Sequence, residues 1–263
     1  ALQKGLRPVL DLRSCNKKIG SSYGTLVLPR FEELLGKHHN KIRSGIDLRK
    51  AFFQIGLDES CREIFSFRVR SRTFQFLRLV QGFSRSPNIM SEVLSTVLSE
   101  ASFERFKLKY PELKNVIHDL SFLFFVDDIT ILSDHDLHIH YLLWSFVCQQ
   151  FDRFDILINT SKCSVAQERS ELLGYQLNSD DNTYCLNPER ALYFQNLRPP
   201  ATRQALISIL SLFNYFRNLV PCLKLLSQNM LVLARSKSPV IFRKTHYREF
   251  FCIKFLLSYQ MRY

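Results

Sequence analysis

Two adjacent carboxylates, Asp127 and Asp128, stand between two strongly apolar segments of the sequence. Residues 120–126 (LSFLFFV) precede the pair and residues 129–132 (ITIL) follow it. Buried carboxylates are costly unless they are paired with other groups or bind cations. Successive side chains of a straight strand face opposite sides, but at a tight hairpin both acids could approach one point. The pair is therefore a candidate cation site.

A third acid, Asp47, follows Gly45 and Ile46 at the end of another apolar segment. Three carboxylates from two strands would supply the hard oxygen ligands that suit magnesium, which takes few protein ligands together with substrate phosphates. Two such ions can activate a hydroxyl and stabilise the leaving oxygen in phosphoryl transfer. The alternative is a solvated turn, because Asp is a favoured turn residue. The apolar flanks weaken that alternative without excluding it.

Local patterns predict the strands that must position these acids. Residues 7–13 have an apolar–polar rhythm, which predicts a strand. Residues 44–48 and 65–69 are also expected to form strands. Residues 120–132 are expected to form a hairpin that is buried under other elements, with the Asp pair at its turn. A further short strand is expected over residues 172–177.

Helical spacing of apolar residues predicts helices over residues 30–36 and 138–154 and a helix that begins at Pro87. Thr202 can cap one more helix. Residues 103–118 alternate between charged and aromatic side chains and are expected to form surface structure. The predicted buried faces of the Pro87 and Thr202 helices consist of Met90, Val93, Leu94 and Val97, and of Leu206, Ile209, Leu210 and Phe213. Strands and helices are mixed irregularly, which indicates an α/β (α+β) fold.

The composition limits the kind of partner and compartment. The 263-residue chain has a formal net charge of +12, which favours a polyanionic partner: nucleic acid is the commonest, and an acidic membrane surface is the alternative. The 7 Cys are scattered and never spaced C-x-x-C, so they indicate a reducing intracellular compartment and no zinc or disulfide framework. No signal peptide or membrane span is apparent. The start without Met and the abrupt end predict a piece of a longer protein.

Several motifs resemble those of one enzyme family. Phe125-Val-Asp-Asp128 resembles the Tyr/Phe-X-Asp-Asp motif of reverse transcriptases. The other matching segments follow in the family's order: residues 7–16 (RPVLDLRSCN), 28–29 (LP), 47–55 (DLRKAFFQI), 81–87 (QGFSRSP), 162–163 (KC), 172–175 (LLGY) and 202–221. Each motif is weak alone, but the ordered set over residues 4–254 is specific. The chain is most similar to gypsy-type LTR retrotransposon enzymes, with BEL/Pao elements and retroviruses as alternatives.

The resemblance implies a right-hand polymerase fold, with an antiparallel palm sheet backed by helices and the acids at its exposed lip. The implied subdomains are fingers at residues 1–24 and 55–85, palm at 25–54 and 86–185, thumb at 186–237, and at 238–263 the start of a tether to a ribonuclease H domain.

The resemblance also implies the chemistry of the three acids. Asp47, Asp127 and Asp128 would bind two magnesium ions, with manganese as an alternative metal, and the Leu48 carbonyl would assist. The primer 3′-hydroxyl would attack the α-phosphate of a deoxynucleoside triphosphate opposite a template, and pyrophosphate would leave.

Further matches imply substrate contacts, each with a simpler alternative. Phe52 would be the aromatic gate that excludes a ribose 2′-hydroxyl, or else a core Phe. Leu173, Gly174 and Tyr175 would form the primer-grip hairpin, or else a strand-end turn. Lys4 and Arg7 would reach the triphosphate, or else are surface cations. The implied nucleotide-binding residues are Lys4, Arg7, Leu48, Arg49, Lys50, Ala51, Phe52, Gln81 and Gly82.

Two charged segments remain. The basic stretch over residues 62–85 fits contact with a template backbone, although charge runs are usually solvated faces. Residues 134–140 (DHDLHIH) have a spacing that could indicate zinc, but no Cys lies nearby, and a solvated helix is the favoured interpretation.

The implied partners are a primed RNA or DNA template, deoxynucleoside triphosphates and the rest of a pol polyprotein with its ribonuclease H and integrase; no membrane partner is expected. The implied location is intracellular, in cytoplasmic virus-like particles, with the nucleus as a further location. Two alternatives stay open: a catalytically inactive or co-opted fragment that binds nucleic acid, and a structural subunit that supports a partner polymerase.

Overall fold

The structure is a computed structural model that describes residues 10–19, 33, 41–126, 128–134, 136–167, 169–178, 183–236 and 239–258. The chain divides into two compact units, residues 1–168 and 169–263, which are described separately. No helix in these described ranges is long and apolar enough to cross a bilayer. The predicted helix over residues 30–36 lies outside the described residues except for Glu33.

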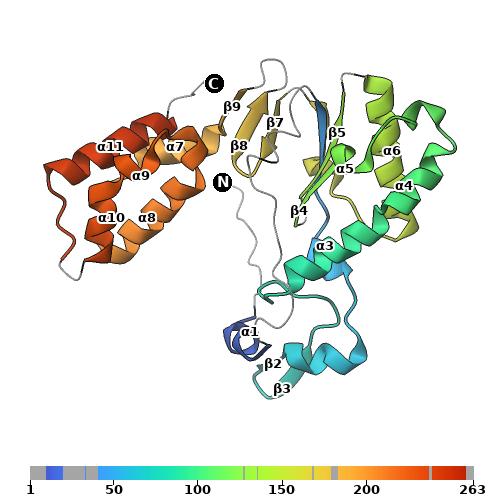
Figure 1. The fold of residues 1–263 in the computed structure, drawn as a ribbon. Coiled ribbons are helices and arrows are strands. Elements are labelled where there is room, and N and C mark those ends of the chain that lie inside the picture. The colour runs from blue at the N-terminus through green and yellow to red at the C-terminus, as the bar shows by residue number, and fades with distance from the viewer. Residues whose placement is uncertain are drawn as a thin grey trace. The chain divides into compact units, whose positions relative to one another are not determined.

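A four-stranded antiparallel sheet forms the centre of the first unit (Figure 1). Its strands run in the order β4 (Phe122–Phe125), β5 (Asp128–Ser133), β1 (Ile42–Ile46) and β6 (Ser164–Gln167). The strand predicted over residues 44–48 is present but begins two residues earlier and ends at Ile46, and the predicted hairpin is confirmed. The β-branched Ile129 and Ile131 are buried, since such side chains pack well on a pleated surface.

One face of this sheet is covered by the helices α3 (Ser86–Val97), α4 (Glu100–Lys107) and α6 (Leu137–Arg153). Met90, Leu94 and Val97 of α3 are buried, as the spacing after Pro87 predicted. Leu143, Phe146 and Val147 of α6 pack into the same core as Ile46 and Ile129 of the sheet. Short turns complete this part of the unit: η3 (Pro111–Leu113), α5 (His118–Ser121) and η4 (Thr160–Lys162).

The prediction of surface structure for residues 103–118 was wrong. Phe103 is 0% exposed and Phe106 is 5% exposed, and Phe103 packs edge-on against Phe122 and Phe146 with ring centroids 5.6 and 5.2 Å apart. Ser99 caps α4 by accepting a hydrogen bond from the Ser102 amide. The charged residues between these rings lie on the outer face of a short helix. Because they dominate the local sequence, the spacing of the two buried rings did not indicate a core helix.

This packing predicts a large loss of stability in Phe103→Ala. Removing a fully buried ring leaves a cavity, so we expect the free energy of unfolding to fall by about 3–5 kcal/mol. Urea denaturation followed by circular dichroism measures it. Leu108→Ala is the control, because Leu108 is 84% exposed at the end of the same helix. A loss in Phe103→Ala no larger than in Leu108→Ala would contradict the packing.

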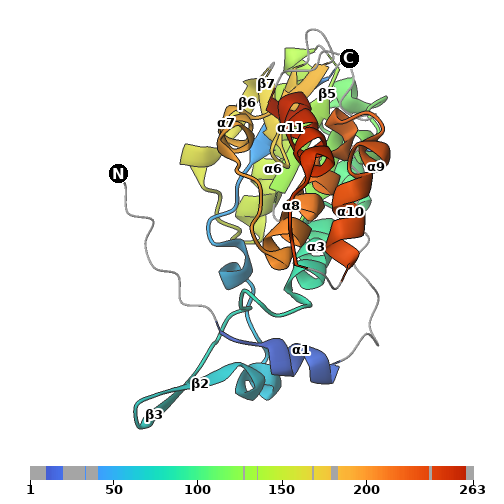
Figure 2. The same cartoon turned by 90° about the vertical axis from the view of Figure 1, so that its left-hand side faces the viewer.

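A smaller cluster in the first unit contains α1 (Arg13–Ile19), η2 (Glu59–Phe65) and the hairpin of β2 (Ser66–Val69) and β3 (Arg72–Gln75), which lie near one another in Figures 1 and 2. Leu12, Phe65 and Val80 form its core. The predicted strand over residues 7–13 is wrong in its described part, because Leu10–Leu12 are irregular and Arg13 begins a helix. The Asp11 carboxylate accepts hydrogen bonds from the Arg13 amide and guanidinium, which turns the chain into that helix.

The second unit combines a three-stranded antiparallel sheet with helices (Figure 1). Its strands are β7 (Arg169–Leu172), β8 (Tyr175–Asn178) and β9 (Thr183–Leu186). Its helices are α7 (Pro188–Asn196), α8 (Arg203–Tyr215), η5 (Arg217–Leu219), α9 (Leu223–Leu226), α10 (Gln228–Arg235) and α11 (Lys244–Ser258). Thr202 caps α8 by accepting a hydrogen bond from the Ala205 amide, and the four predicted positions of α8 are its buried residues.

Candidate active site

Asp47 and Asp128 lie at the same level of the central sheet, on neighbouring strands. Ile46 pairs with Ile129, so Asp47 directly after β1 is level with Asp128 at the start of β5. Ile46 and Ile129 both point into the helix-covered core, and side chains alternate along strands, so the two acids belong to the opposite face. Neighbouring strands are about 5 Å apart. The two acids are therefore brought together; Asp127 lies outside the described residues.

The hairpin that carries the Asp pair has a two-residue connection. Phe125 pairs with Asp128, so only two positions separate the paired ends of β4 and β5, and the described one is Val126. Val126 has a φ of 63°, a left-handed conformation that is unfavourable for a β-branched residue. Two-residue hairpins favour turns with positive φ at this position, so the tight connection imposes the strain.

Residues 157–159 extend the pairing of β1 beyond its end and fix Asp47. The Asn159 amide donates to the Asp47 carbonyl at 2.8 Å, and the Arg49 amide donates to the Leu157 carbonyl at 2.9 Å. The Asn159 side-chain Nδ2 donates to Asp47 Oδ2 at 3.0 Å, and Lys162 Nζ lies 3.7 Å from the same oxygen. Sequence reasoning missed Asn159, because it contacts a residue 112 positions away and stands in no local pattern with it.

The segment after Asp47 forms a compact turn that is held by Gln54. Gln54 Nε2 donates to the carbonyls of Arg49 and Leu157 at 2.8 and 3.0 Å, and the Leu157 amide donates to Gln54 Oε1 at 2.7 Å. Lys50 has a φ of 52° and leads into η1 (Ala51–Gln54). This turn presents the backbone of residues 48–51 beside Asp47.

The side chains of this turn differ in exposure. Leu48 and Ala51 are buried, whereas Arg49 and Lys50 are exposed. Phe52 is half-buried and packs against the main core, which is compatible with both the gate and the core interpretation of this ring.

Gln81 and Gly82 form a turn directly after the buried residues Leu79 and Val80. Gly82 has a φ of 89°, which a side chain would strain. Asn16 of α1 holds this turn: its Nδ2 donates to the Gly82 carbonyl at 2.9 Å, and its Oδ1 accepts from the Ser84 amide at 3.0 Å. Asn16 is the last residue of the matched motif at residues 7–16, so the family resemblance could have indicated that this residue matters for the site. Lys4 and Arg7 lie outside the described residues.

Leu173 and Gly174 form the two-residue turn between β7 and β8 in the second unit, so the predicted hairpin is present. Their φ values of 54° and 84° are both positive, as hairpin turns of this length require. Tyr175 is buried, and its hydroxyl donates to the Tyr215 carbonyl at 3.2 Å. The Tyr215 hydroxyl in turn donates to the Leu173 carbonyl at 3.1 Å, so the end of α8 holds the turn from both sides.

The His-rich segment is the start of α6. Asp136 caps this helix by accepting from the amides of His138 and Ile139. His138 is largely exposed, as predicted, but His140 is 2% exposed, so a solvated face was the wrong prediction for His140. Its ring nitrogens lie 2.6 Å from Ser44 Oγ and 2.8 Å from Ser133 Oγ. The described residues contain no cluster of three His, Cys, Asp or Glu side chains that could hold a metal.

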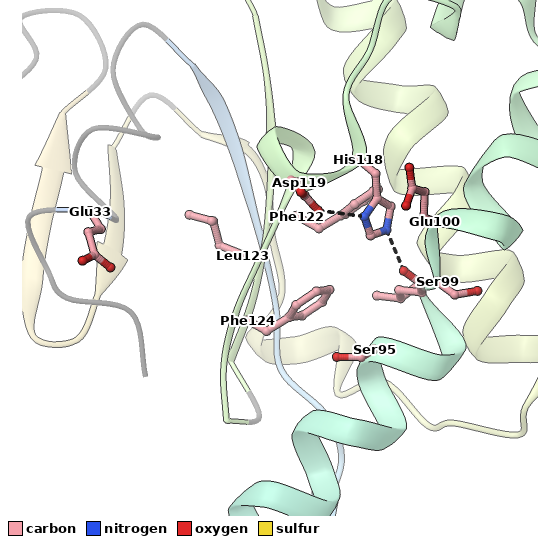
Figure 3. A pocket seen from close by; sticks show the side chains of 10 residues that line it. Glu33, Ser95, Ser99, Glu100, His118, Asp119, Phe122, Leu123 and Phe124 are labelled. Carbon is pink, nitrogen blue, oxygen red and sulfur yellow. Dashed lines mark hydrogen bonds and ion pairs between the residues drawn. The ribbon is translucent and has the colours of Figure 1, made fainter. Parts of the chain in front are cut away.

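A cavity of about 490 Å³ lies beside β4, away from the predicted site residues (Figure 3). It is lined by apolar residues such as Leu98, Phe122 and Phe124, and by the polar His118 and Asp119. The His118 ring has internal partners: Nε2 lies 2.6 Å from the Leu98 carbonyl and Nδ1 lies 3.6 Å from the Asp119 carboxylate.

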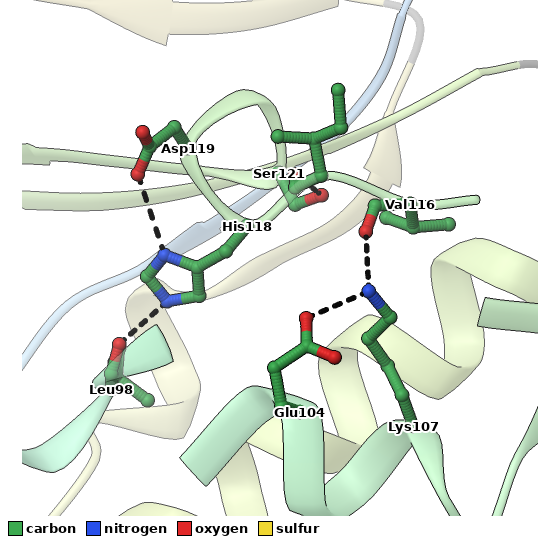
Figure 4. Close-up of polar contacts among 8 residues, drawn as sticks. Leu98, Glu104, Lys107, Val116, His118, Asp119 and Ser121 are labelled. Carbon is green, nitrogen blue, oxygen red and sulfur yellow. Dashed lines mark hydrogen bonds and ion pairs between the residues drawn. The ribbon is translucent and has the colours of Figure 1, made fainter. Parts of the chain in front are cut away.

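A neighbouring polar contact is also internal to the unit. Lys107 Nζ donates to Glu104 at 2.8 Å and to the Val116 carbonyl at 3.3 Å (Figure 4). Together with the His118 contacts, it joins the end of α4 to the segment before β4. We therefore assign these groups a structural role.

Comparisons with known proteins identify the family. A family model described as reverse transcriptase (RNA-dependent DNA polymerase) matches residues 3–177. The Gag-Pol polyprotein of woolly monkey sarcoma virus is 25% identical over 259 residues, which is 94% of this chain and 14% of that protein. The Pol polyprotein from transposon 412 of Drosophila melanogaster is 24% identical over 243 residues, which is 90% of this chain and 18% of that protein.

Solved structures give the same fold. The foamy viral protease-reverse transcriptase in complex with double-stranded DNA has a TM-score of 0.72 at 24% identity, over 95% of this chain and 48% of that one. The same viral protein in complex with an RNA/DNA hybrid has a TM-score of 0.71 at 23% identity, over 95% of this chain and 31% of that one. The right-hand polymerase fold predicted from the sequence is thereby confirmed. Because the family model covers more than half of the chain, this protein belongs to the reverse transcriptase family.

Proposed function

We propose that this chain is an RNA-directed DNA polymerase that extends a primer 3′ end with deoxynucleotides by two-metal-ion phosphoryl transfer. The observation that carries the proposal is the placement of Asp47 and Asp128 on one face, at one level of the central sheet. The chain spans 14% and 18% of the two polyproteins named above, so activity, substrates and partners are proposals for this chain.

The acids fit magnesium by their chemistry. The Asp47 side chain is 34% exposed, and its Oδ2 is held by Asn159 and Lys162, whereas its Oδ1 accepts no hydrogen bond from the described residues. Asp128 is exposed on the same face. Asp47, Asp127, Asp128 and the Leu48 carbonyl would hold two magnesium or manganese ions. When bound, such ions lower the pKa of a hydroxyl nucleophile and neutralise charge on the transferred phosphate.

The nucleotide would lie along the turn that follows Asp47. Arg49 and Lys50 are exposed there and would contact the triphosphate together with the backbone up to Ala51. Arg7 and Lys4 would approach from the fingers, since guanidinium and ammonium groups bind phosphate oxygens. Gln81 and Gly82 would contact the sugar or base, because the Gly82 backbone is open to close approach.

Primer and template would bind along the basic and hairpin surfaces. Arg68, Arg70, Arg72 and Arg78 are exposed on or beside the β2–β3 hairpin, which supports contact with a phosphate backbone. Leu173, Gly174 and Tyr175 would guide the primer end. The solved relatives hold double-stranded DNA and an RNA/DNA hybrid, which supports primed RNA or DNA as the substrate here.

The proposed subdomains keep the limits given by the resemblance. The thumb limit at residue 186 coincides with the last residue of β9, whereas the second compact unit begins at residue 169. The names of the related polyproteins support a place within a longer Pol polyprotein. A ribonuclease H and an integrase as neighbours are proposed from the resemblance alone. An intracellular location, in cytoplasmic virus-like particles with the nucleus as a further location, is likewise proposed from the resemblance.

Primer extension tests the proposal. We expect the chain to extend a DNA primer on RNA and on DNA templates with deoxynucleoside triphosphates and magnesium, and to stop when the metal is chelated. Binding of primer–template without any extension would contradict the proposal and favour the inactive, co-opted fragment. Extension only after a partner polymerase is added, with both proteins in one complex by size-exclusion mass, would favour the structural subunit.

Phe52→Val tests the gate. A smaller side chain would admit a ribose 2′-hydroxyl, so we expect the preference for deoxynucleotides over ribonucleotides, measured as a ratio of kcat/KM values, to fall by about 10-fold or more. Val93→Ala is the control, because Val93 packs against the same core from α3. If Phe52→Val lowers stability and leaves the ratio unchanged, Phe52 is a core residue only.

A further inference from the structure

The Asp47 carboxylate is held by one oxygen only. Asn159 Nδ2 donates to Oδ2 at 3.0 Å, and Lys162 Nζ lies 3.7 Å from that oxygen. Within the described part of the chain, no hydrogen bond to Oδ1 accompanies the one to Oδ2. A carboxylate that is fixed in this way keeps one orientation and presents its second oxygen outward.

The orientation of the Asn159 amide is itself set. The Ser161 hydroxyl donates to Asn159 Oδ1 at 2.9 Å, so the amide oxygen faces Ser161 and the NH₂ group faces Asp47. The opposite orientation would place the amide oxygen against the Asp47 carboxylate, two acceptors facing each other, and would lose the hydrogen bond to Oδ2. The three side chains therefore form a chain of directed hydrogen bonds that ends on Oδ2.

The backbone supports the same arrangement independently of these side chains. Asn159 donates its amide to the Asp47 carbonyl, and the neighbouring Leu48 and Ile158 pair as an isolated bridge. The position of Asn159 opposite Asp47 therefore does not depend on the Asn159 side chain. A substitution of that side chain should leave the turn folded.

We infer that Asn159 is a positioning residue for the metal site: it orients the Asp47 carboxylate so that Oδ1 is presented to a divalent cation, and Ser161 orients Asn159. The inference rests on the proposed function. It assigns a role to a side chain outside the three acids, in a segment more than 100 residues from Asp47 in sequence. Without Asn159, the carboxylate can rotate and each ion binds at an entropic cost.

Metal binding is the measurement, with the complete 263-residue chain. Mn²⁺ binding to the protein with primer–template is followed by electron paramagnetic resonance, and the Mg²⁺ dependence of primer extension is measured beside it. Residues that orient metal ligands typically contribute 10–100-fold to metal affinity or activity, so for Asn159→Leu we expect about 10-fold weaker Mn²⁺ binding and a matching rise in half-saturating Mg²⁺. The KM for primer–template should stay unchanged. Ser161→Ala should shift both quantities in the same direction by less.

Asn196→Ala is the matched control, because Asn196 Nδ2 makes a comparable bond to the Leu192 carbonyl at 2.9 Å within α7. It should bind Mn²⁺ as the wild type does. A folded Asn159→Leu with wild-type Mn²⁺ affinity would overturn the inference. If Asn159→Leu does not fold, unchanged Mn²⁺ affinity in Ser161→Ala overturns it. A wild type that neither binds Mn²⁺ nor extends primers would instead refute the proposed function.

Discussion

Asp47→Asn and Asp128→Asn should each lower the rate of primer extension by about 1,000-fold or more. The substitution keeps the size of the side chain and removes a negative oxygen that would hold a metal ion. Metal ions contribute several kcal/mol of transition-state stabilisation, and about 4 kcal/mol corresponds to a factor of roughly 1,000 in rate. The resemblance predicts the same loss for Asp127→Asn. Affinity for primer–template should change little, because phosphate contacts from cationic side chains supply most of it.

Single-nucleotide incorporation under single-turnover conditions measures this rate, and fluorescence anisotropy measures primer–template affinity. Asp152→Asn is the control, since Asp152 is an exposed acid on α6 and belongs to none of the matched motifs. It should keep the wild-type rate. If either acid variant extended primers at a rate close to that of the wild type, the proposed catalytic role of the substituted acid would be wrong.

The elements that carry the site could be predicted because the sequence patterns that indicate them are local. The hairpin β4–β5 follows from two apolar runs and a two-residue break, and α8 follows from Thr202 and four residues at helical spacing. Both depend on side chains within a few positions of one another. The placement of Asp47 beside Asp128 needed the family motifs in addition, since no local pattern sets the pairing of β1 with β5.

The contacts that support the site could not be predicted in the same way. Asn159 reaches Asp47 across 112 positions, and Asn16 reaches Gly82 across 66. Such polar partners are fixed by tertiary structure, and neither Asn differs in its local sequence from an Asn that makes no such contact. His140 was misjudged for a related reason: it ends a segment rich in Asp and His, residues 134–140, whereas its environment comes from β1 and β5.

The structure around His140 predicts that stability falls in mild acid. Ser133 donates its hydroxyl proton to the Asp134 carbonyl, so its Oγ accepts from Nδ1–H of His140. The Ala166 amide donates to Ser44 Oγ, which leaves the Ser44 hydroxyl proton for Nε2. The neutral ring thus satisfies every group, whereas a second ring proton would face the Ser44 hydroxyl proton. Burial in this environment lowers the pKa of His140 from 6.5 to about 4.

The sign of the effect follows from these values. Above pH 6.5 the ring is neutral in both states and contributes no pH dependence. Between pH 6.5 and about 4, the unfolded chain binds a proton that the folded chain does not. The free energy of unfolding should therefore fall as the pH is lowered through this window, by about 3 kcal/mol from this residue at 1.36 kcal/mol per pKa unit. Below about pH 4 both states are protonated and the loss stops growing.

Urea denaturation at several pH values between 4 and 8, compared between the wild type and His140→Gln, isolates this contribution, because the other titrating groups are shared. His140→Gln should be the less stable protein at pH 7.5, since Gln cannot bridge both hydroxyls with the same geometry. Its stability should fall less steeply with acid, so the two curves converge toward pH 4.

His138→Gln is the control, because His138 stands two residues before His140 and its side chain is 63% exposed. The stability curve of this variant should run parallel to that of the wild type. Parallel curves for His140→Gln as well would mean that the folded protein accepts a charged ring at this position. In that case the hydrogen bonds with Ser44 and Ser133 would not require a neutral His140 ring. These are the hydrogen bonds that join α6 to the strand leading to Asp47.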